Sequence, residues 1–385
     1  MALTAGVTLG NGGANVMPVF VDDFAARFAL GDSGSGLVAA VHLLATAAVT
    51  LLLAKRAAGP GRVRLTRVGL AVMGAGSLGA MAASDVPTLI LANLVLGAGA
   101  GAVYAASTAA IAATDDADKT SAVTIAGVVC VTALMIMAVP QANRGLGGGS
   151  GFLVVALCCL LAWPLVRRLP DGPATGTSAE RAGADSRAAA RPSLILLGAT
   201  ALLWAVTQGA WTYASVLGRE HTGMSQGALS VVLAVSGVVA LAGAVAGPAA
   251  ARRFGRMRSL AAFVTAQALA MVALILTGDP VVFVAAAVLW QACQLAVLVQ
   301  TLAAAALLDP TGRLVAALSG AGALGTGIGP LAAGALLGGA GAGVLGPVLA
   351  VGTVVASLPL MRMAVAATAA TGERTPAPAS LAETG

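Results

Sequence analysis

Charged residues are scarce in this sequence of 385 residues. They make up 9% of the chain, whereas about a quarter of an ordinary soluble chain is charged, so a soluble domain is excluded. Hydrophobic residues supply 58% of the positions, in long runs without the alternation that marks membrane strands. We therefore expect helices to span a membrane. The 50 glycines fit helices that approach one another closely in lipid.

Histidine and cysteine are also scarce, which argues against an enzyme. The two histidines, His42 and His221, lie in opposite halves of the chain, and no glycine-rich phosphate loop ends in Lys-Ser or Lys-Thr. The four cysteines lie inside apolar runs, without the spacing of metal ligands or of a disulfide framework. We expect them to be packing residues, and we expect no cofactor and no metal. A membrane-embedded enzyme is a remote alternative.

Twelve apolar segments are long enough to cross a bilayer, which takes roughly 20 residues each. They divide six and six around a polar stretch rich in Pro, Ser, Gly and Ala, which is typical of a flexible linker. We predict a six-helix half at 1–168, a cytoplasmic linker at 169–192, a second six-helix half at 193–365 and a disordered cytoplasmic tail at 366–385. The predicted spans are 3–28, 34–54, 67–84, 88–112, 120–140, 150–168, 193–217, 227–250, 259–278, 280–307, 313–340 and 343–365.

Basic residues are distributed unevenly between the loops on the two sides. Eighteen of the 21 lysines and arginines share a side with both termini, and only Arg27, Arg144 and Arg219 lie on the other side. This bias predicts cytoplasmic termini in a multi-pass protein of the cell inner or plasma membrane. The net charge of +6 is therefore a topology signal, and we expect no nucleic acid partner. Because Met1 leads directly into apolar sequence, we expect the first segment to be retained as a membrane helix.

Two basic turns occupy corresponding places in the two halves: GRVR (61–64) follows the second span and GRMR (255–258) follows the eighth. Such an echo is expected of a duplicated six-helix unit with parallel halves. The longer segment GPAAARRFGRMR resembles the cytoplasmic loop motif Gly-x-Leu-Ala-Asp-Arg-Phe-Gly-Arg-Arg/Lys-Arg of the major facilitator superfamily. The acidic position of that motif is Ala251 here. The residues that fit are Gly247, Arg252, Phe254, Gly255, Arg256 and Arg258.

Two further segments resemble the drug/proton-antiporter-like branch of this family. GALGTGIGPLAAGALL (322–337) is similar to the family's glycine-rich antiporter helix, and its glycines predict a flat face for close packing beside Pro330. NLVLGAGAG (93–101) resembles a motif that begins with arginine in the family and with Asn93 here, so the proton-relay role of that arginine has no charged carrier. The resemblance implies an all-α membrane fold, with 12 transmembrane helices in two halves that alternate access to a central site.

Polar residues recur at helical spacing in spans 1, 4, 7 and 10, which line the central cavity in the family. A polar group buried in a bilayer is costly, so such stripes mark pathways. Tryptophans beside a glutamine suit an amphipathic or aromatic ligand. The alternative is that these side chains only pack or bond between helices. The predicted substrate-binding residues are Asn11, Asn15, Asn93, Tyr104, Trp204, Gln208, Trp211, Gln291 and Gln294.

None of the 15 acidic residues lies in the middle of a predicted span, and only Asp22 and Asp23 lie where a cavity could reach them. Neighbours on a helix differ by about 100°, so we expect Asp22 to share the face of Asn11 and Asn15, and Asp23 to be a solvated neighbour. His42, in the second span, can titrate near physiological pH. We predict that Asp22, with His42, binds a proton in exchange for substrate. The alternatives are that the aspartates are solvated end charges and that His42 is a packing residue.

The sequence therefore predicts a secondary active transporter that exports a small amphipathic organic compound or drug from a bacterial cytoplasm. Its expected partners are a small-molecule substrate, protons and the lipid bilayer, and we expect a monomer. Import or uniport of a metabolite is the nearest alternative. A non-transporting receptor or scaffold is more remote, because the sequence contains no large soluble domain.

Overall fold

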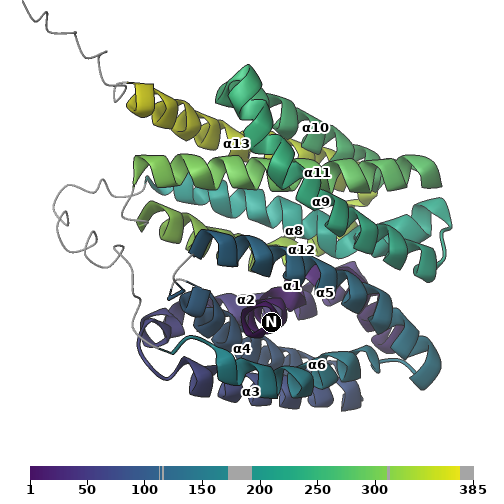
Figure 1. The fold of residues 1–385 in the computed structure, drawn as a ribbon. Coiled ribbons are helices and arrows are strands. Elements are labelled where there is room, and N and C mark those ends of the chain that lie inside the picture. The colour runs from purple at the N-terminus through teal and green to yellow at the C-terminus, as the bar shows by residue number, and fades with distance from the viewer. Residues whose placement is uncertain (112, 115–116, 172–192, 310–312, 373–385) are drawn as a thin grey trace, which may run out of the picture.

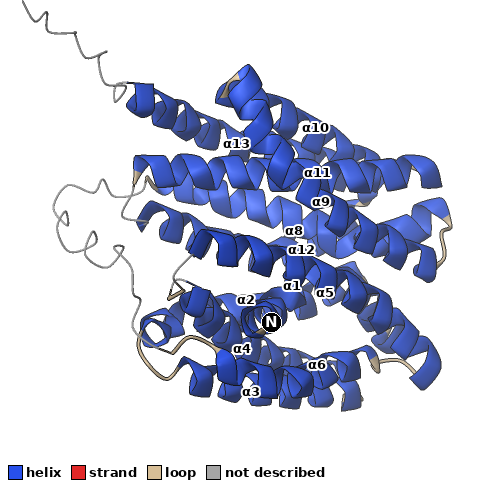
Figure 2. Cartoon of the chain, viewed as in Figure 1, coloured by secondary structure: helices blue, strands red, loops and turns tan. Residues whose placement is uncertain are grey.

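The computed structural model describes residues 1–111, 113–114, 117–171, 193–309 and 313–372. All the regular secondary structure in these ranges is helical, as Figure 2 shows, which confirms the predicted fold class. The short 3₁₀ helix η1 (Val166–Arg168) follows α6. The α-helices are α1 (Ala2–Phe28), α2 (Asp32–Ala58), α3 (Arg62–Ala82), α4 (Val86–Ile111), α5 (Ala117–Leu146), α6 (Gly151–Leu165), α8 (Leu194–Thr222), α9 (Gln226–Phe254), α10 (Arg256–Leu276), α11 (Pro280–Leu308), α12 (Arg313–Ala340) and α13 (Ala342–Gly372).

Eleven of the described helices are long and apolar enough to cross a membrane. The other, α1, has 27 residues, which is ample length at about 1.5 Å per residue, but its aspartates and asparagines make it more polar. Several helices extend beyond the predicted spans, and α13 continues to Gly372 rather than ending at 365. Most of the predicted linker at 169–192, and the predicted tail beyond Gly372, lie outside the described residues.

The helices run side by side, with α1–α6 in the lower part of Figure 1 and α8–α13 in the upper part. We call the end of the bundle where η1 finishes and α8 begins the linker end; it lies on the left in Figure 1, where the yellow α13 also finishes. We call the opposite end the far end. Contacts between the two sets of helices are made by α2 with α12, by α5 with α9 and by α1 with α8.

Side-chain caps begin three helices at the far end, where the turns are short. Ser225 caps α9 by accepting a hydrogen bond from the backbone N–H of Ala228 (3.2 Å), and Asp279 caps α11 from the position before Pro280. Asp85, in the turn before α4, accepts hydrogen bonds from the backbone N–H and the hydroxyl of Thr88, and these hold the pKa of its carboxyl below the ordinary value. Such caps satisfy the first N–H groups of a helix and fix where it begins.

Pairs of glycines spaced four residues apart bring the second and fourth helices of each half together. In the first half Gly97 and Gly101 of α4 lie against backbone carbonyls of α2, and in the second half Gly243 and Gly247 of α9 lie against backbone carbonyls of α11. A Cβ at these positions would press on the partner backbone, so glycine permits the close approach. The hydroxyl of Thr46 reinforces the first contact by donating to the carbonyl of Gly97 (3.1 Å).

We expect Gly97→Val to destabilise the fold by about 3 kcal/mol, the upper end for overpacking, because its side chain would meet the carbonyl of His42. The matched control is Gly74→Val in α3, where an added Cβ meets nothing within 4 Å. The readouts are the monodisperse yield and the melting temperature of the solubilised protein. Equal behaviour of the two variants would show that this approach is not limiting.

Helix α12 joins the two halves through its glycines. Gly325 and Gly329 lie against backbone carbonyls of α8, in their own half, which confirms the close-packing face predicted for 322–337. On another side of α12, Gly327 lies against Leu44 of α2, in the first half. Because α12 packs closely on both helices, it aligns α8 with the first half and so positions the contact between α1 and α8.

Candidate functional site

An ion pair joins the two halves at the far end. A guanidinium nitrogen of Arg219, in the last turn of α8, lies 2.7 Å from Oδ1 of Asp22 in α1. The hydroxyl of Ser215, one turn earlier on α8, donates a hydrogen bond to Oδ2 of the same carboxylate. Asp22 is only 2% exposed, whereas the Arg219 side chain is 42% exposed. A buried charge requires such partners, because leaving water is costly.

The contact continues along α8 toward the middle of the bundle. Trp211 donates its indole N–H to the carbonyl of Asn15 (2.9 Å), and the Gln208 amide donates to the carbonyl of Ala14 (3.0 Å). Both residues belong to the polar stripe predicted on the seventh span, and the structure places them against α1. Both donors are therefore used in holding α8 on α1.

A second contact closes the far end beside the first. The hydroxyl of Tyr213 donates to the carbonyl of Asp32 at the start of α2 (2.6 Å) and lies 3.4 Å from the carbonyl of Pro330 in α12. Ser33 also donates to the carbonyl of Gly334 (3.2 Å). Sequence reasoning missed Tyr213, because it lies outside the predicted stripe of α8. Its position just before Ala214 and Ser215 gives no signal of a partner in α2.

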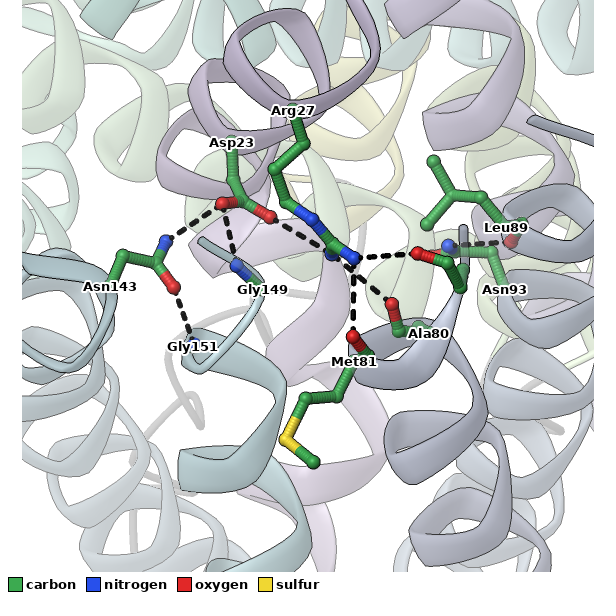
Figure 3. A network of polar contacts seen from close by, with 10 residues as sticks. Asp23, Arg27, Ala80, Met81, Leu89, Asn93, Asn143, Gly149 and Gly151 are labelled. Atoms are coloured by element: carbon green, nitrogen blue, oxygen red, sulfur yellow. Dashed lines mark hydrogen bonds and ion pairs between the residues drawn. The ribbon is translucent and has the colours of Figure 1, made fainter. Parts of the chain in front are cut away.

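Asp23 is buried, at 5% exposure, so the prediction that it is a solvated neighbour was wrong. Figure 3 shows the network that Asp23 makes with Asn143, Gly149 and Arg27. Its Oδ1 accepts hydrogen bonds from the backbone N–H of Gly149 (3.0 Å) and from the amide of Asn143 (3.1 Å). Its Oδ2 lies 3.6 Å from the guanidinium of Arg27.

Arg27 extends this network to the end of α3. Its guanidinium donates to the carbonyls of Ala80, Met81 and Ala83, at 3.0–3.1 Å. These carbonyls belong to the last turn of α3 and its exit, where a helix has unpaired acceptors and a partial negative charge. The network of Asp23, Asn143, Gly149 and Arg27, which we call the far-end clasp, ties α1 to α3 and to the α5–α6 turn.

His42 and Asn93 lie in a separate pocket inside the first half, between α1–α6. The other residues that line the pocket are apolar. Its volume of about 20 Å³ has room for one water molecule. Asn93 donates to the carbonyl of Leu89 (3.0 Å). Neither ring nitrogen of His42 has a hydrogen-bond partner among the described residues, and the ring lies against Gly13. No hydrogen bond joins His42 to Asp22 in the described part of the chain.

The remaining predicted substrate residues do not gather into one cluster. Asn11 is exposed and Gln291 is half-buried. The half-buried Gln294 accepts hydrogen bonds from the amide of Gln267 (2.5 Å) and the hydroxyl of Thr207 (3.3 Å). Two half-buried aromatic residues pack between helices: Tyr104 lies beside Gly10 of α1 and Trp204 beside Gly322 of α12.

Two indoles lie together between α8 and α11. The ring centroids of Trp211 and Trp290 are 6.0 Å apart with an interplanar angle of 39°. Trp290 is buried, and its indole N–H has no partner among the described residues. Such a pair offers a large apolar surface together with donors that fix orientation.

The loop-motif residues lie at the linker end. Gly247 packs on α11, and Arg258 is exposed in the first turn of α10. Arg252, Gly255 and Arg256 line a pocket between the end of α9, the start of α10 and α11. The basic turns of both halves thus lie at the same end of the bundle as the linker.

Comparisons with known proteins agree with this fold. The model of the Major Facilitator Superfamily matches residues 2–313, and no curated protein sequence matches the chain. One similar solved structure is a bacterial homolog to the human lysosomal transporter Spinster, inward-facing and unoccupied, with 18% identity and a TM-score of 0.68 over 96% of this chain and 94% of that chain. Another is a D-xylose-proton symporter, with 15% identity and a TM-score of 0.71 over 94% and 95%.

A POT family transporter in complex with 5-aminolevulinic acid is also similar, with 11% identity and a TM-score of 0.73 over 95% of each chain. At these identities the likeness to solved structures shows the fold alone. The match of the family model covers most of the chain, from the first helix to the start of α12. This chain therefore belongs to the major facilitator superfamily and is a membrane transporter rather than an enzyme.

Proposed function

We propose that this transporter exports a small amphipathic organic compound in exchange for protons, as expected of the drug/proton-antiporter-like branch. The observation that carries the proposal is the pair of Asp22 and Arg219, a buried carboxylate whose partner comes from the other half. A carboxylate that binds a proton cannot also keep its ion pair, so the state of Asp22 affects whether the far end stays closed. The bias of basic residues supports a cytoplasmic linker end and a far end that faces outside.

In the proposed cycle, the carboxylate of Asp22 alternates between two partners: a bound proton and the guanidinium of Arg219. When the far end opens, Asp22 separates from Arg219, and water from outside delivers a proton to it. When the far end closes, the ion pair re-forms and the proton leaves toward the linker end. Substrate moves in the opposite direction, by rocking of the two halves. One charge carried across the membrane contributes about 2.3 kcal/mol per 100 mV.

Substrate binding uses donors that the closed far end occupies. Gln208 and Trp211 donate to backbone carbonyls of α1 in the closed conformation, and separation of α8 from α1 would free both for a ligand beside Trp290. A ligand with an aromatic or other flat apolar body and one or two acceptors fits these groups. The other residues proposed to line its path are Asn11, Asn15, Asn93, Tyr104, Trp204, Gln291 and Gln294.

We expect Asp22→Asn to lose at least tenfold of the transport driven by an imposed pH gradient in proteoliposomes, while counterflow of substrate persists. Asparagine cannot take up and release a proton, whereas counterflow needs no net proton movement. The matched control is Asp85→Asn, an exposed carboxylate at the same end, which should transport like wild type. Gradient-driven transport by Asp22→Asn at the wild-type rate would refute the coupling role of Asp22.

Import or uniport of a metabolite is the second candidate, and Asn93 favours it. The family's arginine at this position is replaced by an amide that donates to its own helix, so one charged group that could couple transport to protons is missing. The same vesicles separate the candidates. In proton-coupled export, protons flowing down the pH gradient drive substrate in the opposite direction, against its own concentration gradient. A uniporter only equilibrates substrate, whatever the pH.

A further inference from the structure

A basic pocket lies at the linker end of the second half and takes no part in the proposed cycle. It has a volume of about 320 Å³ and is formed by the end of α9, the start of α10 and the last third of α11. Two arginines, Arg252 and Arg256, line it, and none of its described lining residues is acidic. Among the described residues no ion pair reaches either arginine, and one guanidinium nitrogen of Arg256 is buried without a partner. The described lining of the pocket is therefore positively charged.

The side chain of Gln300 forms the buried wall of this pocket. It is 3% exposed, and both its amide nitrogen and its amide oxygen lack hydrogen-bond partners among the described residues. A buried polar group without a partner costs free energy, and native structures rarely leave one unsatisfied. Gln300 requires a partner that both accepts and donates a hydrogen bond. A bare carboxylate can only accept.

At the corresponding turn in the first half, a carboxylate binds the start of the helix. There, Oδ1 of Asp171 accepts hydrogen bonds from the backbone N–H groups of Gly61 (2.8 Å) and Arg62 (2.6 Å), at the start of α3. The matching residues at the start of α10 are Gly255 and Arg256, and no described side chain accepts a hydrogen bond from either backbone N–H. A helix N-terminus attracts anions, because its first N–H groups are unpaired and its dipole is positive there.

The sequence also omits the residue that would neutralise this pocket. Ala251 lines it and stands where the loop motif of the family has its aspartate. The carboxylate is therefore missing from the motif position, and none of the described residues supplies one as a cap on α10. The arginines, the helix start and the unpaired amide of Gln300 remain directed at the same space.

We propose that this pocket binds an anion of the phosphate class that also carries a hydroxyl group, in place of the missing carboxylate. The phosphate oxygens accept from Arg252, Arg256, the start of α10 and the amide nitrogen of Gln300, and the hydroxyl donates to the amide oxygen of Gln300. Hydrogen phosphate from the aqueous phase and the headgroup of phosphatidylglycerol both have this chemistry. Charge-assisted hydrogen bonds from arginine make the site selective for phosphate over chloride.

The test measures binding by the full-length protein. The melting temperature in detergent is followed with inorganic phosphate and with chloride at equal ionic strength, and retention of phosphatidylglycerol against phosphatidylcholine is followed by native mass spectrometry. We expect a rise of roughly 2 °C or more with saturating phosphate, or selective retention of phosphatidylglycerol. The first result identifies a soluble anion, and the second alone identifies the lipid. The absence of both effects would overturn the proposal.

Two variants assign the effect to the pocket. Ala251→Asp restores the carboxylate of the family motif, so it should bind either ligand at least tenfold more weakly and melt higher than wild type without ligand. Gln300→Leu removes both amide groups with little change in volume and should weaken binding similarly. The control is Arg253→Gln, which removes a neighbouring charge that stacks over Phe254 (5.3 Å) outside the pocket. Wild-type binding by Ala251→Asp, or equal loss in the control, would refute the site.

Discussion

Arg219→Gln is expected to shift the transporter toward the far-end-open conformation by roughly 30-fold, about 2 kcal/mol. The substitution leaves the carboxylate of Asp22 at 2% exposure without its cation whenever the far end closes. Removing one partner of a fully buried pair costs about 3–5 kcal/mol. The effect here is smaller, because the Arg219 side chain is 42% exposed and water screens it.

The same variant is expected to reverse the pH dependence of opening. In the wild type, acid protonates Asp22 and removes the attraction to Arg219, so acid opens the far end. In Arg219→Gln, acid neutralises a carboxylate that would otherwise be buried alone, so acid closes the far end. The neighbouring carboxylate, Asp23, is paired with Arg27 on another side of α1 and is present in both proteins. In the double variant Asp22→Asn/Arg219→Gln, acid should neither open nor close the far end.

Double electron–electron resonance between spin labels at positions 146 and 281 measures this opening, after replacement of the native cysteines. Both positions are exposed at the far end, Leu146 on α5 in the first half and Val281 on α11 in the second. The double-mutant cycle isolates the interaction between Asp22 and Arg219 from other effects of each substitution. If acid opens Arg219→Gln as it opens the wild type, the pair does not control the far end.

Asp23→Ala is expected to lower the free energy of unfolding of the first half by roughly 3 kcal/mol. The change removes the acceptor for Asn143 and for the backbone N–H of Gly149, and it leaves the guanidinium of Arg27 without its carboxylate. These groups are largely buried, so water compensates them poorly. Unlike a substitution at Asp22, this one should leave the balance between open and closed far ends unchanged, because the clasp lies within one half.

The readouts for the clasp are the melting temperature and the same spin-label distance. Asp23→Asn keeps an oxygen that can accept from Gly149 but loses the ion pair, so its stability should fall between wild type and Asp23→Ala. Asp85→Ala, which removes an exposed cap at the start of α4, is the control and should cost far less. Melting of Asp23→Ala within error of that control would show that the clasp does not stabilise the fold.

The helical fold could be predicted because its cause is local. Long apolar runs, a polar stretch in the middle and a bias of basic residues depend only on neighbouring letters of the sequence. The glycines of 322–337 were also readable, since a spacing of four residues marks one face of a helix wherever that helix packs. The ends of helices were less predictable, because extension beyond the apolar run, as at the end of α13, depends on packing with other helices.

The two aspartates show where such reasoning stops. Spacing assigned Asp22 and Asp23 to different faces of α1, but it could not say what each face meets. Because α1 contacts helices of both halves, both aspartates are buried, and the partner Gly149 of Asp23 lies 126 residues away. Arg27, four residues after Asp23, was a local signal of pairing. Arg219, eight residues after Trp211, similarly extends the stripe of α8 and could have been added to it.

Spacing predicted the stripe on α8, but what the stripe contacts depends on conformation. Gln208 and Trp211 contact α1 in the closed far end, and a sequence contains no record of which conformation is populated. The basic pocket at the linker end could be predicted only in part. The absence of an aspartate at position 251 was visible in the sequence. Gln300, which has no hydrogen-bond partner among the described residues, lies 49 positions further along the chain, and only the fold brings it beside Ala251.

The central claim is that closing the far end exchanges a proton on Asp22 for Arg219. The most direct measurement is the distance distribution between labels at 146 and 281 in wild-type protein in nanodiscs, titrated from mildly alkaline to mildly acidic pH and compared with Asp22→Asn. The account predicts that the far-end-open fraction of the wild type rises as pH falls, and that Asp22→Asn is shifted toward open at every pH with no titration. A wild-type distribution that does not change with pH, or an Asp22→Asn protein that titrates like the wild type, would contradict it.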